Sequence, residues 1–256
     1  MTSPELTGGA GFTYEDAVAA QYLAAMVACT TAAALDARVV QRVAQQQADF
    51  GEPLDDVIVD AASLADGTVM RLSLQVKRSL TISEANSDFR EVIQRSWQTL
   101  QKPDFREHVD RVGAVTGSVA EEMSRAFATV CEWARASDTT AAFMQRFVDG
   151  GNASATHRAV VEAVRMVAQD RGAPLSDDQL YRLLSHLVLI RFDFLHAGST
   201  HEADAIVGLQ RALAPGQAVR AGDLWDLLRQ FARDGAGRSA VHTRASLVRA
   251  LAGWRF

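Results

Sequence analysis

The sequence predicts an α/β protein, with a mixed sheet and flanking helices in its first half and an all-helical module in its second half. Three observations lead to this prediction. Short segments rich in β-branched residues alternate with turns over residues 38–79. An amphipathic segment and one more strand-like run follow over residues 89–118. From residue 119 onward every segment has helical periodicity, and breaks containing glycine or proline separate the segments.

Composition limits the classes of protein that fit. The chain has 256 residues, of which 48% are hydrophobic, so it can form one large domain or two small ones with a buried core. Its formal net charge of −5 means that any contact with nucleic acid must come from a local basic patch. The longest apolar stretch, residues 17–35, is mostly alanine and predicts an internal helix rather than a membrane span. With no CxxC spacing between Cys29 and Cys131 and no signal peptide, we expect buried free thiols and a cytoplasmic location without membrane contact.

The elements of the first half follow from local signals. Thr13, with Asp16 three residues later, has the spacing of a capping box and predicts a helix over residues 14–35. Strands are expected over residues 38–46, 54–62 and 69–79. The Asp66-Gly67 turn joins the last two strands into a hairpin.

Apolar residues at helical spacing then predict a helix over residues 89–100, and a short strand is expected over residues 110–118. The helices expected after this strand lie near residues 119–136, 139–149, 155–171, 176–195, 201–213, 222–233 and 243–253. We therefore divide the chain into a core over residues 1–136 and a helical module for regulation or oligomerisation over residues 137–256.

Lys77 is the first candidate functional residue. The chain has only two lysines against 24 arginines, and an ammonium is not equivalent to a planar guanidinium. Because side chains alternate along a strand, Gln75 and Lys77 lie side by side on one polar face. The same alternation in the neighbouring strand favours Asp56 over Asp55 as the carboxylate that faces them, and the choice between these two stays open.

A carboxylate and an amide oxygen near a lysine fit a site for Mg²⁺ or Mn²⁺, which prefer oxygen ligands. We expect Asp56 to be the principal metal ligand, with the side-chain oxygen of Gln75 and the carbonyl of Val76 completing the set. Lys77 would orient or deprotonate an attacking water and offset phosphate charge. The same residues also fit a purely structural explanation, with an acidic pair that ends a loop and a solvated lysine at the end of a strand.

Several stretches of the sequence carry a resemblance to a known family. They are Gly8–Glu15, Leu54–Val57, Leu74–Ser79 and Ser87–Phe89, followed by Arg191–Phe194, Ser199 and Glu202. Together they resemble the PD-(D/E)XK effector nucleases of bacterial anti-phage defence. These are Mrr-related domains that head cyclic-oligonucleotide-activated nucleases and STAND-type NTPases. The resemblance implies a restriction-endonuclease-like mixed sheet flanked by helices.

The resemblance also implies a function. It is that of a Mg²⁺-dependent deoxyribonuclease that cleaves double-stranded DNA with little sequence preference, and RNA is an alternative substrate. By that resemblance Asp56, Gln75 and Lys77 match the catalytic positions, and Glu15 matches an acidic residue of the first helix that often joins such sites. The implied partners are DNA, further copies of the chain, and a fused or separate sensor NTPase.

A basic face is expected to contact the DNA, and it is only mildly basic because acidic residues lie between its members. Arg78, Arg71 and Arg90 are the main candidates, with Arg95 and Lys102 nearby. An ordinary solvated helix face explains the helical members equally well. The uncharged Gln75 and the acidic pI of about 5.7 favour an alternative function, that of a catalytically inactive adaptor with the same fold.

Overall fold

The computed structural model describes residues 13–170 and 172–256. The strands of the main sheet are β1 (Arg38–Gln45), β2 (Val57–Ser63), β3 (Val69–Ser79), β4 (Arg111–Ser118), β7 (Leu187–Arg191) and β8 (Val241–Thr243). A separate two-stranded ladder pairs β5 (Gln169–Asp170) with β6 (Ala173–Pro174). The helices are α1 (Tyr14–Ala28), α2 (Ser87–Leu100), α3 (Glu121–Ala136), α4 (Thr140–Met144), α5 (Ala155–Val167), α6 (Asp177–His186), α7 (Thr200–Ala212), α8 (Ala221–Ala236) and α9 (Arg244–Ala250), with short 3₁₀ turns η2 (Ala48–Phe50) and η3 (Ala218–Arg220).

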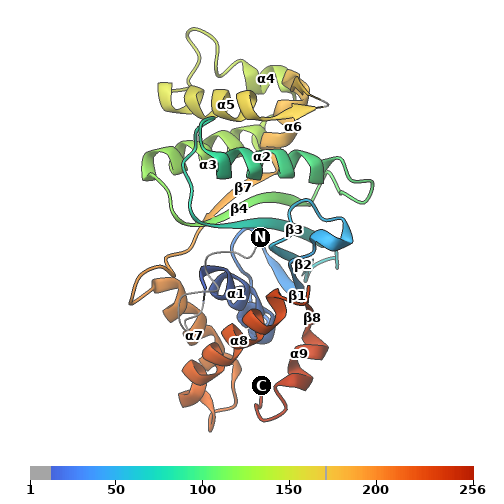
Figure 1. Ribbon diagram of the computed structural model, residues 1–256, viewed down its shortest axis with the longest axis vertical. Coiled ribbons are helices and arrows are strands. Elements are labelled where there is room, and N and C mark those ends of the chain that lie inside the picture. The colour runs from blue at the N-terminus through green and yellow to red at the C-terminus, as the bar shows by residue number, and fades with distance from the viewer. Residues whose placement is uncertain (1–12, 171) are drawn as a thin grey trace.

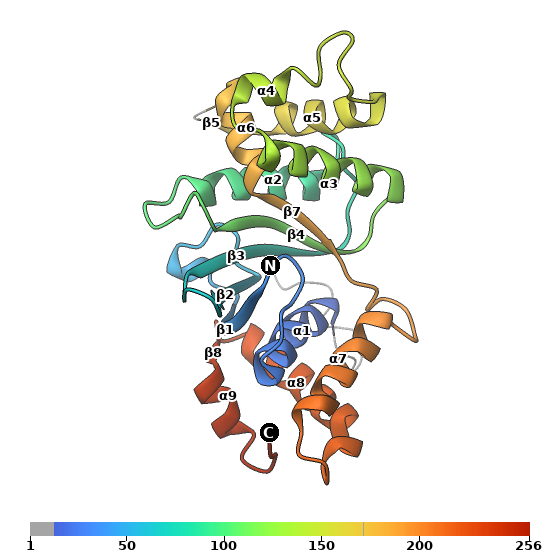
Figure 2. The ribbon, with the colours of Figure 1, turned by 180° about the vertical axis from the view of Figure 1, so that it is seen from behind.

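The main sheet lies between two layers of helices (Figure 1). Helices α2 and α3 cover one face, and α4, α5 and α6 stack beyond them. Helices α1 and α8 lie against the other face and α7 packs on these two helices, and the reverse view in Figure 2 shows the same layering. The prediction of an α/β fold with a mixed sheet flanked by helices is therefore confirmed.

The strand order within the main sheet is β7-β4-β3-β2-β1-β8. Strands β8, β1, β2 and β3 pair antiparallel, whereas β3, β4 and β7 pair parallel. In the β2–β3 hairpin, Val57 lies opposite Leu74. This register brings Asp56, one residue before β2, to the level of Gln75 on β3.

Gly113 allows β4 and β7 to approach closely. Its φ is 154°, and a Cβ built at this position would lie 1.9 Å from the carbonyl oxygen of Val188. Any other residue would collide with that backbone, which cannot move aside without breaking the β4–β7 pairing.

The first helix begins as predicted and ends earlier than predicted. Thr13 and Asp16 form the expected capping box around the start of α1. The helix ends at Ala28, because Cys29 takes a left-handed conformation with φ 53°. Nearly all of α1 is buried against the sheet, α7 and α8, which explains its apolar sequence. Within the described residues, no helix has the length and apolar character needed to cross a membrane.

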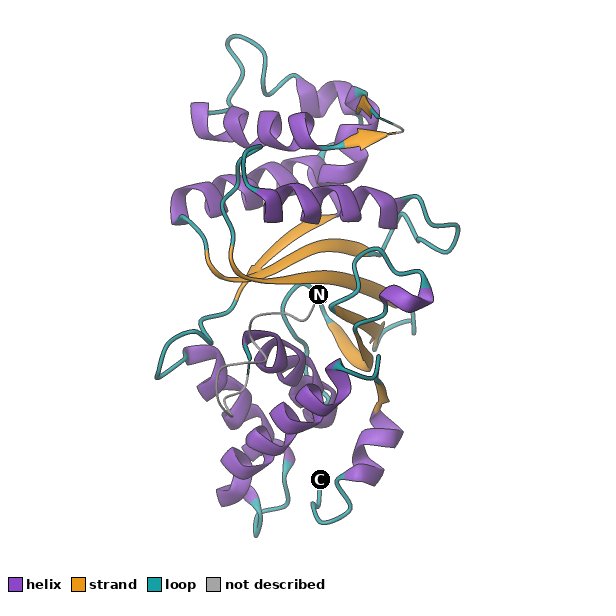
Figure 3. Ribbon diagram, in the orientation of Figure 1, coloured by secondary structure: helices purple, strands orange, loops and turns teal. Residues whose placement is uncertain are grey.

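The expectation of an all-helical second half is wrong. Two strands from that half, β7 and β8, join the main sheet beside β4 and β1 (Figure 3). The helix expected over residues 176–195 ends at His186, and the run Leu187–Ile190 continues as β7. Four consecutive apolar residues fit a buried strand as well as a helix. The boundary between residues 136 and 137 stays a prediction, although strands from both sides of it share the sheet.

A separate apolar core fills each side of the sheet. The core on the α1 side includes Tyr22, Leu72 and Trp225, all essentially inaccessible to solvent. The core on the α2 side includes Phe89 and Phe143. Both faces of the central strands are covered. A polar side chain on these strands therefore either has a hydrogen-bond partner or serves a functional role. Both cysteines are free; Cys131 is buried as expected, whereas Cys29 is exposed.

Candidate functional site

Asp56 and Gln75 meet at the end of the β2–β3 hairpin. The Oδ2 atom of Asp56 accepts hydrogen bonds from the side-chain Nε2 of Gln75 at 2.6 Å and from the backbone N–H of Val76 at 2.7 Å. Both side chains are buried. The structure thus brings Asp56, rather than its neighbour Asp55, beside Gln75.

Glu15 joins this group from the first turn of α1. Its Oε1 atom accepts a hydrogen bond from Gln46. Burial, followed by the nearby charge of Asp56, raises the pKa of Glu15 to about 7. Burial likewise raises the pKa of Asp56 to about 6, against the opposing effect of the Val76 N–H. The two carboxylates therefore share a poorly solvated space that disfavours two negative charges.

Within the described residues, each of these carboxylates has one oxygen that accepts no hydrogen bond. Among the described residues, no donor reaches Oδ1 of Asp56 or Oε2 of Glu15. A pocket of about 190 Å³ is lined by Tyr14, Glu15, Val76, Lys77 and Arg78. Of the two carboxylates, only that of Glu15 is in this lining, together with the cationic side chains of Lys77 and Arg78.

Lys77 lies at this pocket but forms ion pairs with helix α2. Its Nζ atom is 2.7 Å from Oε2 of Glu91 and 3.3 Å from Oδ1 of Asp88. Burial alone would lower the pKa of Lys77, but the hydrogen bond and charge of Glu91, assisted by Asp88, raise that pKa above its usual value. Lys77 is therefore a permanent cation here. It suits the role of offsetting phosphate charge better than that of removing a proton from water.

Arg95 is a central residue of the site that the sequence analysis did not identify as such. Its Nη1 atom donates to Oδ1 of Asp55 at 2.6 Å and to Oε1 of Gln75 at 3.2 Å. Its Nη2 atom lies 2.8 Å from Oε1 of Glu91. Glu91 thus connects Arg95 with Lys77, and the spacing of four residues between Glu91 and Arg95 on α2 is the sequence signal for such a pair.

Some of the predicted ligands, Asp56, Gln75, Val76 and Glu15, are suited to a hard divalent cation and others are not. Within residues 13–170 and 172–256, no group of three or more His, Cys, Asp or Glu side chains could hold a metal. Mg²⁺ often takes only one or two protein carboxylates and completes its shell with water and phosphate oxygens, so Asp56 and Glu15 suit it. Gln75 does not, because its oxygen faces Arg95 and its N–H₂ group faces Asp56. Val76 contributes its N–H to Asp56.

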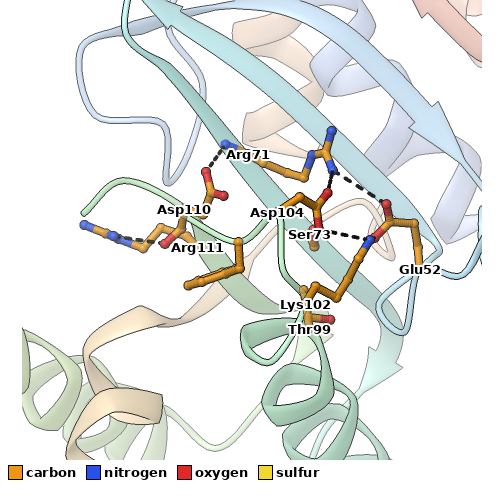
Figure 4. Close-up of a pocket in the computed structure, with 9 residues that line it drawn as sticks. Glu52, Arg71, Ser73, Thr99, Lys102, Asp104, Asp110 and Arg111 are labelled. Carbon is orange, nitrogen blue, oxygen red and sulfur yellow. Dashed lines mark hydrogen bonds and ion pairs between the residues drawn. The ribbon is translucent and has the colours of Figure 1, made fainter. Parts of the chain in front are cut away.

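The predicted DNA-contacting arginines do not form one surface. Arg71 lies about 20 Å from Lys77 along β3, six residues away. There it pairs with Asp60 at 2.9 Å. It also pairs with Asp104 at 3.3 Å and with Glu52 at 3.6 Å, as Figure 4 shows. Lys102 belongs to the same network, which lines a cavity of about 10 Å³, room for one water molecule. These cations form ion pairs with local carboxylates and are separate from the Asp56 site.

Arg90 lines a third feature, an open groove of about 440 Å³ along the outer side of α2. Its other lining residues are Ser87, Glu91, Gln94, Arg95 and Gln98. Of the three arginines, only Arg78 lines the pocket beside Glu15.

Comparisons with known proteins concern the fold. Neither the known protein families nor the curated proteins include a match to this chain. Among solved structures, the chain is similar to an Acinetobacter baumannii Cap4 SAVED/CARF-domain containing receptor with the cyclic trinucleotide 3′3′3′-cAAA. The TM-score of this match is 0.51 and the sequence identity is 10%. The match covers 93% of this chain and 45% of that one. A Moraxella osloensis Cap4 SAVED/CARF-domain containing receptor matches with a TM-score of 0.46 and 13% identity, covering 88% of this chain and 43% of that one.

The first of these matches corrects two predictions. The similar structure with a TM-score of 0.51 is described as a receptor that contains a SAVED/CARF domain, and not as a PD-(D/E)XK nuclease domain. The predicted family is therefore wrong. The predicted function, that of a DNA endonuclease or of an inactive adaptor with the same fold, is therefore also wrong. At 10% identity the likeness concerns the fold, and the chain spans less than half the length of these receptors.

Proposed function

We propose that this chain is a ligand-recognising part of a cyclic-oligonucleotide receptor of anti-phage defence. We further propose that Glu15, which lines the pocket, and the nearby Asp56 bind a phosphate of that ligand through a divalent cation. Similarity of fold to a receptor with a bound cyclic trinucleotide supports the ligand class. The chemistry of the pocket supports the way in which the ligand is held.

One observation carries the proposal. Glu15 and Asp56 are two poorly solvated carboxylates with raised pKa values, and the charge of Asp56 contributes to raising the pKa of Glu15. Burying like charges is costly unless an opposite charge compensates them. Mg²⁺ or Mn²⁺ would supply that charge and would coordinate a phosphate oxygen of the ligand.

The cationic wall of the pocket favours an anionic ligand. Lys77 keeps its proton because of Glu91 and Asp88, and Arg78 lines the same pocket. A phosphodiester group that approaches the cation would meet the Lys77 ammonium at the end of β3. A charge-assisted hydrogen bond to phosphate is about twice as strong as a neutral one.

Several finer expectations remain proposals beside this one. They are a cytoplasmic location, assembly with further copies of the chain or with a sensor NTPase, and a restriction-endonuclease-like arrangement of the sheet. Mg²⁺-dependent hydrolysis of a phosphodiester bond at this site also stays a prediction, because a fold likeness to receptors does not test it.

Titration calorimetry tests the proposed function. The whole chain is titrated with Mn²⁺, and then with 3′3′3′-cAAA in the presence of either Mn²⁺ or EDTA. We expect Mn²⁺ to bind, and the trinucleotide to bind only when Mn²⁺ is present. Asp56→Asn should weaken Mn²⁺ binding by at least about 10-fold, because it removes the anionic ligand and keeps its shape.

Asp204→Asn is the matched control, since Asp204 is exposed on α7 and distant in sequence from the pocket. This variant should bind Mn²⁺ and the trinucleotide as the wild type does. Equal Mn²⁺ affinity in Asp56→Asn and the wild type would refute the site. Binding of the trinucleotide in EDTA at undiminished affinity would refute the role of the cation.

A further inference from the structure

We propose that the outer edge of β7 binds an extended peptide segment of a partner, with carboxylates at both ends of the paired stretch. Strand β7 is the last strand of the main sheet on one side, and its inner side pairs with β4 (Figure 2). An edge strand presents unpaired backbone N–H and C=O groups to which a further strand can be added. The groove beside this edge shares no lining residue with the pocket beside Glu15, so the interaction is independent of the proposed function.

Leu189 directs both of its backbone groups away from the sheet. The N–H of Phe192 donates to the C=O of Thr116 at 3.1 Å, and in a parallel ladder alternate residues of a strand bond to the same neighbour. Ile190 therefore also bonds to β4, whereas Leu189 and Arg191 face outward. Within the described residues, neither the N–H nor the C=O of Leu189 has a hydrogen-bond partner. An added strand could exchange two backbone hydrogen bonds with this residue.

An apolar groove of about 280 Å³ lies beside this edge, and residues 187–190 are part of its lining. Phe127 and Cys131 of α3 line it and belong to the core on the α2 side of the sheet. Ala33 and Ala34 also line it, and Ala34 packs against the core on the α1 side. Because successive side chains of a strand point to opposite faces, an added strand would meet apolar surface on both faces.

The charges at the two ends of β7 favour an acidic partner. At the first end, Nη1 of Arg135 donates to the C=O of Leu187 at 3.1 Å. Burial, followed by the charge of Arg135, lowers the pKa of Arg111, so these two cations lie near each other. Arg191 is exposed at the other end. Within the described residues, none of these three arginines forms an ion pair with a carboxylate, so acidic residues at both ends of an added strand would complement them in either direction of pairing.

A second copy of the chain fits this edge less well. Two β7 strands paired antiparallel about Leu189 would place Arg191 of each copy opposite Leu187 of the other, beside Arg135. Like charges that face each other across a strand pair are destabilising. The charge pattern therefore favours a different segment, one that carries carboxylates.

NMR titration of the whole chain with a capped five-residue peptide tests the proposal. The acidic probe is acetyl-Glu-Val-Thr-Val-Glu-amide, which matches the length of β7 and has no terminal charges. The control probe is acetyl-Lys-Val-Thr-Val-Lys-amide. We expect the acidic probe to shift the amide signals of Leu189 and Arg191 and to slow hydrogen exchange of the Leu189 N–H. It should bind at least about 10-fold more tightly than the lysine probe, because each end contributes an attraction in one case and a repulsion in the other.

Three variants separate charge from backbone pairing. Arg135→Glu reverses the charge at one end and should reduce the preference for the acidic probe to about 3-fold or less. Arg125→Glu is the matched control, because it makes the same change at an exposed position of α3 outside the groove, and it should leave the preference unchanged. Leu189→Pro removes the outward N–H without removing a hydrogen bond to β4, and it should abolish binding.

The proposal is overturned if millimolar acidic probe leaves the Leu189 amide unchanged, if the two probes bind equally, or if Leu189→Pro binds as the wild type does. If Leu189→Pro does not fold, hydrogen exchange at Leu189 in the wild type decides the same point. Slow exchange of the Leu189 N–H in the chain alone that becomes fast on dilution would show that a second copy occupies the edge, and this result would also overturn the proposal.

Discussion

Replacing Asp56 by asparagine should stabilise the cation-free protein at high pH. Burial raises the pKa of Asp56 from 3.8 to about 6, so the folded state holds this carboxylate in its charged form at a cost. Each tenfold change in a proton equilibrium corresponds to about 1.4 kcal/mol, which makes the cost about 3 kcal/mol at pH 8 and about 1 kcal/mol at pH 4.5. Stability is therefore lost as pH rises from about 4 toward 6, and the neutral asparagine avoids this loss.

The assay is urea unfolding of the wild type and Asp56→Asn in EDTA at pH 4.5 and pH 8. The folded carboxyl is protonated at pH 4.5, and the hydrogen bond that its charged form accepts from Val76 already contributes to its pKa. The advantage of Asp56→Asn should therefore grow by about 2 kcal/mol from pH 4.5 to pH 8. If the difference in unfolding free energy between Asp56→Asn and the wild type stays constant or shrinks with rising pH, position 56 does not hold a buried, uncompensated charge, and the claim is refuted. Asp204→Asn, a substitution at an exposed position of α7, is the control for the loss of one carboxylate.

Two further predictions use matched pairs of residues. Gly113→Ala should destabilise the fold by about 3 kcal/mol or more in urea unfolding, because its Cβ would collide with the Val188 carbonyl. Gly222→Ala is the control: there is open space around Gly222, so this substitution should change stability by less than about 1 kcal/mol. Equal effects of the two substitutions would refute the close approach of β4 and β7. Lys77→Met should weaken binding of 3′3′3′-cAAA with Mn²⁺ by roughly 10-fold in calorimetry, whereas Lys102→Met should not. The two lysines are similarly exposed, at 18% and 23%, and each forms two ion pairs, so equal losses would indicate a general charge effect.

Local chemistry was sufficient to predict much of the sheet. The bounds of β3 follow from alternation and from the Asp66-Gly67 turn, and the start of α1 follows from the Thr13 capping box. These features depend on neighbours within a few residues, so the sequence contains them almost completely. The end of α1 was missed because the helical periodicity continues past Cys29, where the backbone turns left-handed.

The strand β7 could not be predicted because its neighbours are distant in sequence. Leu187–Ile190 follows a helix directly, and only the parallel pairing with β4, about 75 residues earlier, gives this run an extended conformation. The three residues of β8 pair with β1 across an even longer separation. Such contacts are properties of the assembled sheet, not of the local sequence.

The site was predicted in part for the same reason. Alternation along the hairpin was enough to bring Asp56 to Gln75. The partners of Lys77 and the role of Arg95 depend on which side of α2 packs against β3, and the sequence of α2 alone does not contain this information. The family prediction failed because a few polar residues at common spacings occur on many unrelated sheets.

The most direct measurement is an anomalous difference map from crystals of this protein soaked in Mn²⁺. The account predicts a peak within about 2.3 Å of one oxygen of Asp56 and one oxygen of Glu15, with water or phosphate in the remaining positions. The same map for Asp56→Asn crystals should lack that peak. A wild-type map without a peak between these two carboxylates, or with its only peak elsewhere on the molecule, would contradict the account.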